Sequence, residues 1–299
     1  MTVGPAGSTP ERWRALVAVN LAALIFGATA LFGKIAASPL WIVAGRVMFA
    51  AAALALVAAL RRVSLRLERR DAIRVARAAA LLAFHWATFF GSVQVAGVAV
   101  ATLTVSTFPL FTILLQAGLR RQWPSLWELI AGLAIVGAVA LIAGPGVKVA
   151  PNAQTGALIG LASAVSFAVF SLTTQNLGRR LAPLVLSFWQ CIFVALLLAP
   201  ALPFVPGFQA ASDWLAIAAL GIIGTALTHQ LFLFALARLP AAACGAAVSM
   251  EPIYAILLAV LLFGDAWSPA ILVAAALIVG ASWILLRAPK VEAGALHAG

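Results

Sequence analysis

Two charged residues stand inside long apolar stretches, where an ionised side chain is costly. Glu251 lies near the middle of the apolar segment 241–263, and Arg46 lies about a third of the way into the segment 39–60. A buried carboxylate can receive an ammonium group and a guanidinium can receive a carboxylate, so together they could hold the two ends of an amino acid. Alternatively, both groups form salt bridges or bond to backbone carbonyls and never meet a ligand. Arg46, the shallower of the two, fits that alternative better.

Two histidines occupy matched places in apolar segments. His85 is followed by Trp86, and His229 is followed by Gln230. A single histidine on an apolar face is usually a core residue with its ring nitrogens satisfied. Two at equivalent positions, with these neighbours, favour a shared polar cavity. Either ring could also titrate near neutral pH and pass a proton.

Two prolines interrupt apolar segments in a repeated Ser-x-x-Pro pattern. Pro109 follows Ser106 and Pro252 follows Ser249. Each proline removes a backbone donor and frees the carbonyl four residues before it. In lipid that carbonyl needs a partner, and the serine hydroxyls stand beside it. The functional interpretation is a pair of hinges or a polar patch at a symmetry axis; the alternative is a static kink that aids packing.

Aromatic and amide side chains complete the candidate cavity. A small-molecule site is mostly apolar with a few placed polar groups, and aromatic faces attract cations. For any single aromatic residue, packing against lipid or core is the competing interpretation. The candidates on the same segments are Phe26, Phe32, Phe89, Phe90, Phe167, Phe170, Trp189, Gln190 and Tyr254.

Enzymatic chemistry finds little support among the residues. Gly280-Ala281-Ser282-Trp283 loosely resembles a Gly-x-Ser hydrolase motif, but no histidine is evident at its depth. The chain has no His-Glu-x-x-His, no aspartate pair and no Gly-x-x-x-x-Gly-Lys loop, which excludes direct use of ATP. Its two cysteines, Cys191 and Cys244, provide neither a metal cluster nor a disulfide framework. We therefore expect no enzyme, no metal and no cofactor.

The composition indicates a membrane protein. Of the 299 residues, 65% are hydrophobic and 9% are charged, and the mean hydropathy is +1.12. A soluble domain carries about 25% charged residues. A fold of this size cannot hide so much apolar surface from water, so the lipid bilayer must solvate much of it.

The apolar runs divide into ten predicted transmembrane helices. A span needs about 20 apolar residues to cross the hydrocarbon layer, and clusters of Gly and Pro separate the runs. Segments 74–96 and 98–119 are separated only by Gly97. The predicted spans are 13–34, 39–60, 74–96, 98–119, 125–143, 153–176, 183–202, 212–236, 241–263 and 268–286.

The basic residues orient these spans. The net charge of +11 could suggest nucleic acid, but the charges lie in short clusters between apolar runs. With the N-terminus inside, 16 of the 19 Lys and Arg residues fall on the cytoplasmic side, while Lys34 and Lys148 fall outside and Arg46 lies within a span. Cytoplasmic loops carry this excess. The prediction is a bacterial inner membrane protein with both termini cytoplasmic and no nucleic-acid partner.

The two halves of the chain repeat each other at a nearly constant offset. Ser106 and Pro109 match Ser249 and Pro252 at an offset of 143, and His85 matches His229 at 144. Pro39 and Arg46 match Pro183 and Gln190, also at 144. Each half holds five spans, an odd number, so the second half enters the membrane from the opposite side. Inverted repeats suit alternating access, in which a central site opens to one face and then to the other.

Ten spans, a duplicated unit and the stretch Ser249-Met250-Glu251-Pro252 … Leu262-Phe263-Gly264-Asp265 resemble the EamA-type transporters of the drug/metabolite transporter superfamily. The resemblance covers residues 15–287 and departs at Gly264-Asp265, where the family usually has Gly-Glu. The aromatic residues and the His85-Trp86 pair look most like the YddG-type aromatic amino-acid exporters. The resemblance implies that spans 1–4 and 6–9 line a central cavity and that spans 5 and 10 lie outside it.

These observations predict an all-α membrane protein of two inverted five-helix repeats, at 13–146 and 147–287, with cytoplasmic tails at 1–12 and 288–299. The expected function is export of aromatic and other neutral amino acids, or related metabolites. A lipophilic-cation exporter is the alternative, and an intramembrane enzyme is the weaker one. Transport is either passive facilitation or proton exchange through Glu251 or His229.

Overall fold

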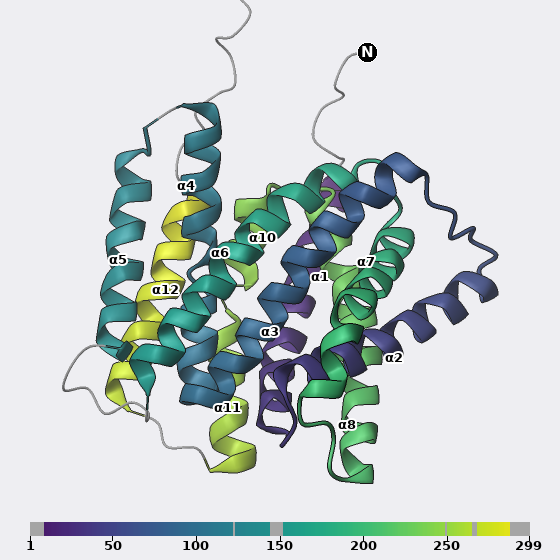
Figure 1. The fold of residues 1–299 in the computed structure, drawn as a ribbon. Coiled ribbons are helices and arrows are strands. Elements are labelled where there is room, and N and C mark those ends of the chain that lie inside the picture. The colour runs from purple at the N-terminus through teal and green to yellow at the C-terminus, as the bar shows by residue number, and fades with distance from the viewer. Residues whose placement is uncertain (1–8, 122, 144–151, 249, 265–267, 288–299) are drawn as a thin grey trace, which may run out of the picture.

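The computed structural model describes residues 9–121, 123–143, 152–248, 250–264 and 268–287. These residues form a bundle of helices with short connections (Figure 1). The elements are α1 (Thr9–Thr29), η1 (Ala30–Lys34), α2 (Pro39–Leu60), α3 (Arg69–Val105), α4 (Phe108–Arg120), α5 (Leu126–Ala143), α6 (Ala153–Gly178), α7 (Pro183–Leu198), η2 (Ala199–Phe204), α8 (Ala211–Gly221), η3 (Ile222–Leu227), α9 (Thr228–Leu236), α10 (Ala241–Val248), α11 (Glu251–Phe263) and α12 (Pro269–Arg287).

These elements make up the ten predicted spans. Six helical stretches in the described residues are long and apolar enough to cross a membrane, and four shorter apolar helices accompany them. α3 supplies both span 3 and the first part of span 4. The two spans meet at a kink at Gly97, whose non-helical backbone angles (φ 83°, ψ 171°) favour glycine. The helix that holds span 3 begins at Arg69, five residues before the start of the predicted span at 74. The tail predicted at 288–299 and the repeat boundary predicted at 146 lie outside the described residues, and of the tail predicted at 1–12 the structure describes only residues 9–12, which belong to α1.

Spans 4 and 9 are each broken in the middle, at equivalent positions. In span 4 the helix stops at Val105 and α4 restarts at Phe108; in span 9, α10 ends at Val248 and α11 begins at Glu251. Pro109 and Pro252 stand in the first turn of the restarted helices, where a missing N–H is tolerated. The interruptions lie beside the two prolines from which the sequence predicted a hinge or a kink, because a proline cannot donate to the carbonyl of the preceding turn.

Span 8 contains a second irregularity. Between α8 and α9, the six residues of η3 form a π-helical turn inside the span predicted at 212–236. A π turn inserts one extra residue into a helix and is often found at functional sites. No proline or charged residue in the segment indicates this turn.

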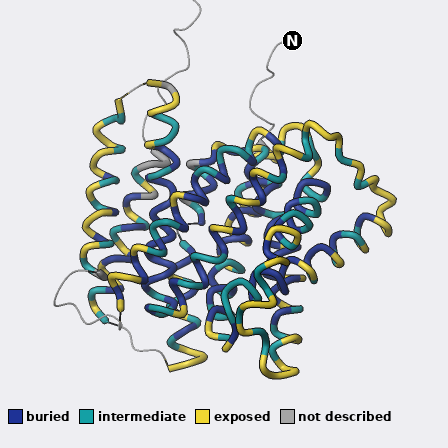
Figure 2. The backbone as a smooth tube through the Cα atoms, in the orientation of Figure 1, coloured by how far each residue is buried: buried dark blue, intermediate teal, exposed yellow. Residues whose placement is uncertain are grey.

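The two halves interlock rather than lying side by side. Span 3 packs on span 6, span 8 packs on span 1, and span 2 packs on span 7, which are pairings between halves. α5 packs on α12 at one side of the molecule (Figure 1), where the resemblance placed spans 5 and 10. Buried residues concentrate inside the remaining helices, and α5 is largely exposed (Figure 2).

Small residues allow the closest approach between halves, on α6. A Cβ atom at Gly156 would collide with Ala96, and one at Gly160 would collide with Thr104. The hydroxyl of Ser92 donates a hydrogen bond to the Gly156 carbonyl across the same contact, at 2.7 Å. Close backbone approach through small residues is the usual basis of helix association in a membrane.

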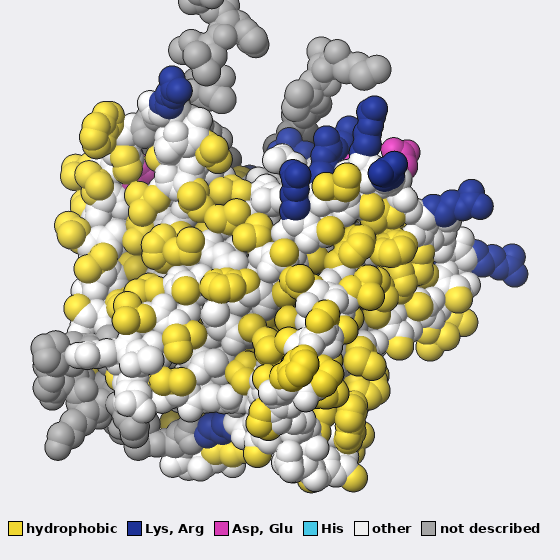
Figure 3. All heavy atoms as spheres, viewed as in Figure 1, with side chains coloured by type: hydrophobic (Ala, Val, Ile, Leu, Met, Phe, Trp, Pro, Cys, Tyr) yellow, Lys and Arg dark blue, Asp and Glu magenta, His cyan; other side chains and the backbone are white. Residues whose placement is uncertain are grey.

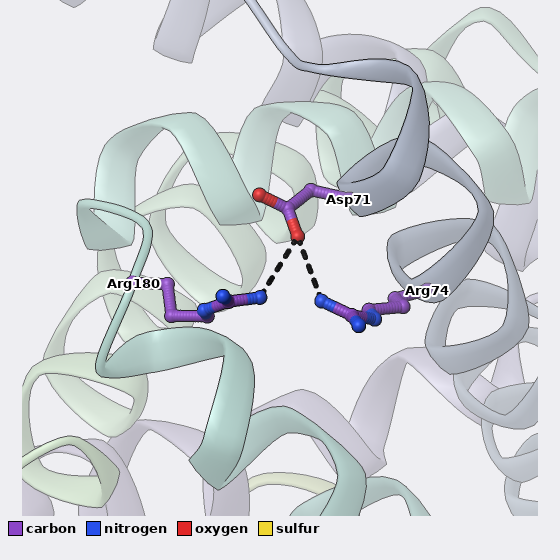
Figure 4. A network of polar contacts seen from close by, with 3 residues as sticks. All are labelled: Asp71, Arg74 and Arg180. Carbon is purple, nitrogen blue, oxygen red and sulfur yellow. Dashed lines mark hydrogen bonds and ion pairs between the residues drawn. The ribbon is translucent and has the colours of Figure 1, made fainter.

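Basic side chains gather at one end of the molecule, where α1 begins (Figure 3). At this end Asp71 accepts contacts from Arg74 at 3.3 Å and from Arg180 at 3.6 Å (Figure 4). Arg238 and Glu11 form a second ion pair, at 2.9 Å. Because Asp71 and Glu11 belong to the first half and Arg180 and Arg238 to the second, both pairs connect the halves.

We expect the Asp71–Arg180 contact to contribute little to stability. Substituting Arg180→Gln should lower the free energy of unfolding by less than about 1 kcal/mol, because solvent screens an ion pair of this kind and the Arg180 side chain is 61% exposed. Thermal unfolding of purified protein beside Arg179→Gln, the exposed neighbour, measures the difference. A loss of stability well above that of the control would mean that the pair is a principal link between the halves.

Candidate functional site

A small cavity lies at the centre of the bundle, between the two halves. It encloses about 30 Å³, room for roughly two water molecules. Sites for small molecules usually measure about 300–1,000 Å³, so this conformation is closed around its centre. The lining residues come from spans 1–4, 6, 8 and 9: Phe26, Thr29, Arg46, Leu82, His85, Trp86, Phe89, Val105, Ser106, Phe108, Phe167, His229, Val248 and Glu251.

The breaks in spans 4 and 9 both reach this cavity. Val105, Ser106 and Phe108 flank the break in span 4, and Val248 and Glu251 flank the break in span 9. Irregular backbone at membrane depth is tolerated where it is buried in protein or lines a cavity. The cavity therefore lies where the two interrupted helices meet, which is the usual place for a binding site in transporters built from inverted repeats.

Arg46 is 1% exposed and is held on three sides. Its Nε donates to the hydroxyl of Thr225 at 2.8 Å, and its Nη2 donates to the Gly224 carbonyl at 3.1 Å. The guanidinium also lies over the ring of Trp86, 4.4 Å from the centroid, and 5.5 Å from that of Phe90. These contacts correspond to the structural alternative foreseen for Arg46, yet the side chain also lines the cavity.

Glu251 has no such partners. It is 7% exposed and lines the cavity from the first turn of α11. Within the described part of the chain its carboxylate forms neither a hydrogen bond nor an ion pair, and Arg46 is beyond ion-pair distance. A buried carboxylate is expensive unless a cation or hydrogen-bond donor compensates it, so Glu251 is a candidate ligand for a cation.

His85 is tied to the second half of the chain. Its Nδ1 lies 2.8 Å from the Ser163 hydroxyl, which also donates to the His85 carbonyl at 2.9 Å. The imidazole stacks on Phe167 with centroids 4.4 Å apart. Span 3 and span 6 thus hold the ring in a fixed orientation at the cavity wall.

His229, the repeat mate of His85, is held differently. Its Nε2 lies 3.0 Å from the Gln190 amide oxygen, and the Gln190 amide nitrogen donates to Thr174 at 3.4 Å. Gln190 is the repeat mate of Arg46 but does not line the cavity. Gln190 contacts His229 from outside the cavity lining, whereas its repeat mate Arg46 lines the cavity directly.

An aromatic cluster closes the cavity on the side of span 6. Phe167 stacks on His85 and Phe232 and meets the edge of Phe108, with centroids 4.4, 5.6 and 4.8 Å apart respectively. Aromatic pairs in these geometries add stability beyond the area they bury. The cavity therefore presents one apolar aromatic wall and two ionisable groups, the guanidinium of Arg46 and the carboxyl of Glu251.

The structure brings together nine of the residues proposed from the sequence and leaves others outside the cavity lining. Those in the lining are Phe26, Arg46, His85, Trp86, Phe89, Ser106, Phe167, His229 and Glu251. The proposed residues that do not line it are Phe32, Phe90, Pro109, Phe170, Trp189, Gln190, Gln230, Pro252 and Tyr254. Ser249 lies outside the described residues.

The polar and aromatic residues that were proposed from the sequence but do not line the cavity have other structural roles. Trp189 donates its indole N–H to the Leu65 carbonyl at 2.7 Å and packs on aromatic neighbours. Gln230 donates to the Pro183 carbonyl at 2.9 Å, at the start of α7. Tyr254 packs against Gly27 of span 1, where a Cβ on the glycine would lie 2.6 Å from the Tyr254 Cβ. Helix rotation, which hydrophobic pattern does not specify here, directs these side chains elsewhere.

Five lining residues were not proposed from the sequence: Thr29, Leu82, Val105, Phe108 and Val248. Phe108 carried a usable signal, because it is the repeat mate of Glu251 at the offset of 143. The others are ordinary apolar or hydroxyl residues in apolar segments. Among the described residues, no three His, Cys, Asp or Glu side chains come together as metal ligands do.

Comparisons with known proteins agree with this architecture. The threonine/homoserine exporter RhtA of Escherichia coli (strain K12) is 28% identical over 197 residues, which are 65% of this chain and 64% of the exporter. RhtA from two further Escherichia coli strains matches to the same extent. A solved crystal structure of another protein covers 94% of this chain and 99% of its own at a TM-score of 0.70 and 24% identity, a likeness of fold alone. The model of the EamA-like transporter family matches residues 13–144 and again 154–287, so the chain belongs to that family.

Proposed function

We propose that this protein exports neutral amino acids, aromatic ones included, across the bacterial inner membrane. The observation that carries the proposal is that one small cavity beside an aromatic wall is lined both by a guanidinium, Arg46, and by a carboxylate, Glu251, which has no hydrogen-bond or ion-pair partner among the described residues. A zwitterion would place its ammonium on Glu251 and its carboxylate on Arg46, and each charge would then be matched. The similarity to a threonine/homoserine exporter supports an amino acid as the substrate.

The closed cavity implies movement during transport. At about 30 Å³ it is far too small for an amino acid, so the halves must separate on one side to admit the substrate and on the other to release it. The breaks beside Pro109 and Pro252 are the natural hinges, since no helix ladder runs continuously through them. Alternating access between inverted halves is therefore part of the proposal.

The proposed orientation places both termini in the cytoplasm. It is supported by the concentration of Arg side chains at one end of the molecule (Figure 3) and by the preference of cytoplasmic loops for basic residues. Substituted-cysteine labelling after Gly178 in intact cells tests it. Reactivity with an impermeant reagent from outside would show that the protein has the opposite orientation.

Export of lipophilic cations is the second candidate. The aromatic wall around Phe167 and the carboxylate of Glu251 would also suit a lipophilic cation. Arg46 argues against it, because a buried guanidinium near the site repels a cation that brings no carboxylate. Amino acids and lipophilic cations are thus distinguished by whether the substrate must carry a negative group.

Counterflow in proteoliposomes separates the two. We expect labelled L-threonine or L-phenylalanine to exchange against unlabelled amino acid, and tetraphenylphosphonium neither to exchange nor to compete. Counterflow needs no imposed gradient, so the result does not depend on whether protons drive transport. Liposomes without protein are the control for leak. Exchange of tetraphenylphosphonium without exchange of any amino acid would replace the proposal with the second candidate.

A further inference from the structure

We propose that the π-helical turn in span 8 is an anchor that orients Arg46 as the receptor for the substrate's carboxylate, with Thr225 and Gly224 as its positioning residues. The inference rests on the proposed function, in which Arg46 meets a carboxylate. It adds that two residues outside the cavity lining determine how well the protein selects substrates that carry a carboxylate.

The π turn makes a backbone carbonyl available to Arg46. In a regular helix the N–H of Thr228 would donate to the carbonyl of Gly224, four residues earlier. Here it donates to the carbonyls of Ile223 and Thr225 instead. The Gly224 carbonyl accepts from Arg46 Nη2 at 3.1 Å. An inserted residue that shifts the ladder is the recognised way for a helix to release such a group.

Thr225 supplies the second contact from the same turn. Its hydroxyl accepts from Arg46 Nε at 2.8 Å and donates to the Leu220 carbonyl at 2.9 Å, so both its donor and acceptor roles are used. Gly224 leaves space for this arrangement, because a Cβ there would lie 2.7 Å from Thr29 and 2.9 Å from Leu220. The hydroxyl and the carbonyl together define the plane of the guanidinium.

The plane is also set from the other side. Trp86 lies under the guanidinium at 4.4 Å, so the group is clamped between span 3 and the π turn. A guanidinium has five N–H donors, and the contacts with Thr225 and Gly224 use the Nε hydrogen and one Nη2 hydrogen. The remaining donors belong to a side chain that lines the cavity. A planar fork held in this way is suited to a carboxylate, which it can bind through two parallel bonds.

The repeat provides an independent reason to connect the turn with Arg46. At the offset of 144, Ala80 and Leu81 of span 3 correspond to Gly224 and Thr225, and Gln190 corresponds to Arg46. Span 3 is regular helix at that point, since its only non-helical residue is Gly97. The π turn thus occurs in span 8, which contacts Arg46. It is absent from the equivalent point of span 3, whose corresponding partner would be Gln190. Two departures from symmetry coincide in one contact.

No described carboxylate lies within ion-pair distance of the guanidinium. Ion pairs in the described residues involve Asp71 and Glu11, both outside span 2, and none involves Arg46. A structural arginine of this burial would normally be neutralised by an acidic partner. The anchor contributes neutral acceptors only, which orient the charge without cancelling it.

The test compares two buried threonines of the same span. Thr225→Val removes the hydroxyl that contacts Arg46, and Thr228→Val removes a hydroxyl that donates to the Ile223 carbonyl at 2.7 Å and does not touch Arg46. For each variant, counterflow of labelled L-phenylalanine is inhibited with unlabelled L-phenylalanine and with 2-phenylethylamine, its carboxylate-free counterpart. L-Threonine and 1-aminopropan-2-ol form the second pair.

We expect Thr225→Val to raise the KM for the amino acid roughly tenfold, as for the loss of one hydrogen bond to a charged group, with kcat little changed. The preference for the amino acid over its amine should fall by the same factor. Thr228→Val should keep the preference of the parent, and Thr225→Ser, which retains a hydroxyl, should restore it. Thermal unfolding of each purified variant shows whether it is folded.

The outcomes separate the anchor from the proposed function. If Arg46→Gln abolishes the preference for a carboxylate while Thr225→Val and Thr228→Val behave alike, the anchor is refuted and the receptor role of Arg46 stands. If Arg46→Gln also retains the parent's preference, the receptor role fails and the inference fails with it. If Thr225→Val does not fold, Thr225→Ser and Thr225→Cys provide the comparison, since the two differ in acceptor strength at nearly the same volume.

Discussion

Replacing Glu251 by glutamine is expected to lower the kcat/KM for counterflow of a neutral amino acid by roughly 30-fold or more. The figure follows from the loss of a desolvated charge pair, about 2–5 kcal/mol. In the parent, the carboxylate lines the cavity without a partner among the described residues, so the substrate's ammonium is the group that it can neutralise. Glutamine has nearly the same shape, and the effect is therefore one of charge.

The change should also alter which substrates are accepted. In the Glu251→Gln variant, Arg46 is the remaining charge in the cavity. The kcat/KM for an N-acetylated amino acid, which is anionic and lacks an ammonium, should therefore fall much less than the kcat/KM for the free amino acid. Glu68→Gln is the matched control, because Glu68 is exposed at the start of α3. Equal losses for the free and N-acetylated amino acids would show that Glu251 supports the fold and does not bind the ammonium.

A different role for Glu251 would give a different pattern. If it carries a proton in exchange for substrate, the glutamine variant would keep counterflow at equal pH and lose only uptake driven by a proton gradient. Measuring both in the same proteoliposomes distinguishes ammonium binding from coupling. Retained counterflow would contradict the binding role proposed here.

Replacing Gly160 by valine is expected to destabilise the protein by about 3 kcal/mol, the upper part of the usual range for overpacking a core. A Cβ at this position would overlap the Thr104 hydroxyl and lie 2.9 Å from the Thr104 Cβ and 3.3 Å from the Ser92 hydroxyl. Thr104 is fully buried, and its hydroxyl is already bonded to the Val100 carbonyl at 2.7 Å. It cannot turn aside without leaving that bond.

The defect should be specific to the contact between halves. A Cβ added to Gly137 on α5 would meet no atom within 4 Å, so Gly137→Val gives the cost of valine in a membrane helix without a clash. Thermal unfolding and size-exclusion profiles in one detergent compare the two. Equal stability of the variants would mean that span 6 does not approach spans 3 and 4 as closely as the structure places it.

Much of the fold could be predicted because it depends on composition and order alone. Long apolar runs require helices in lipid, since every backbone polar group must be bonded within its own segment. The offset between the Ser-x-x-Pro stretches at Pro109 and Pro252 revealed the duplication, which the family match at 13–144 and 154–287 agrees with. The same prolines marked where spans 4 and 9 would be interrupted, although the sequence did not indicate that the helices restart there as separate elements.

The residues that line the cavity were only partly predictable, because the sequence does not specify how each helix is rotated about its own axis. Helices that are apolar on all sides carry no periodic stripe to show which face turns inward, so the choice between Trp86 and Trp189 as cavity residue depends on helix packing. The π turn at Gly224 and Thr225, whose Gly224 carbonyl accepts from Arg46, is likewise visible only in the tertiary structure, because no residue pattern in the segment predicts it.

The sequence by itself determined the solvent, the number of spans and the repeat, because these follow from hydrophobicity and spacing. Only the tertiary structure decided that Arg46 is held by neutral partners while Glu251 faces the cavity without one among the described residues. The physical reason is that partners so far apart in the chain meet only when the helices pack.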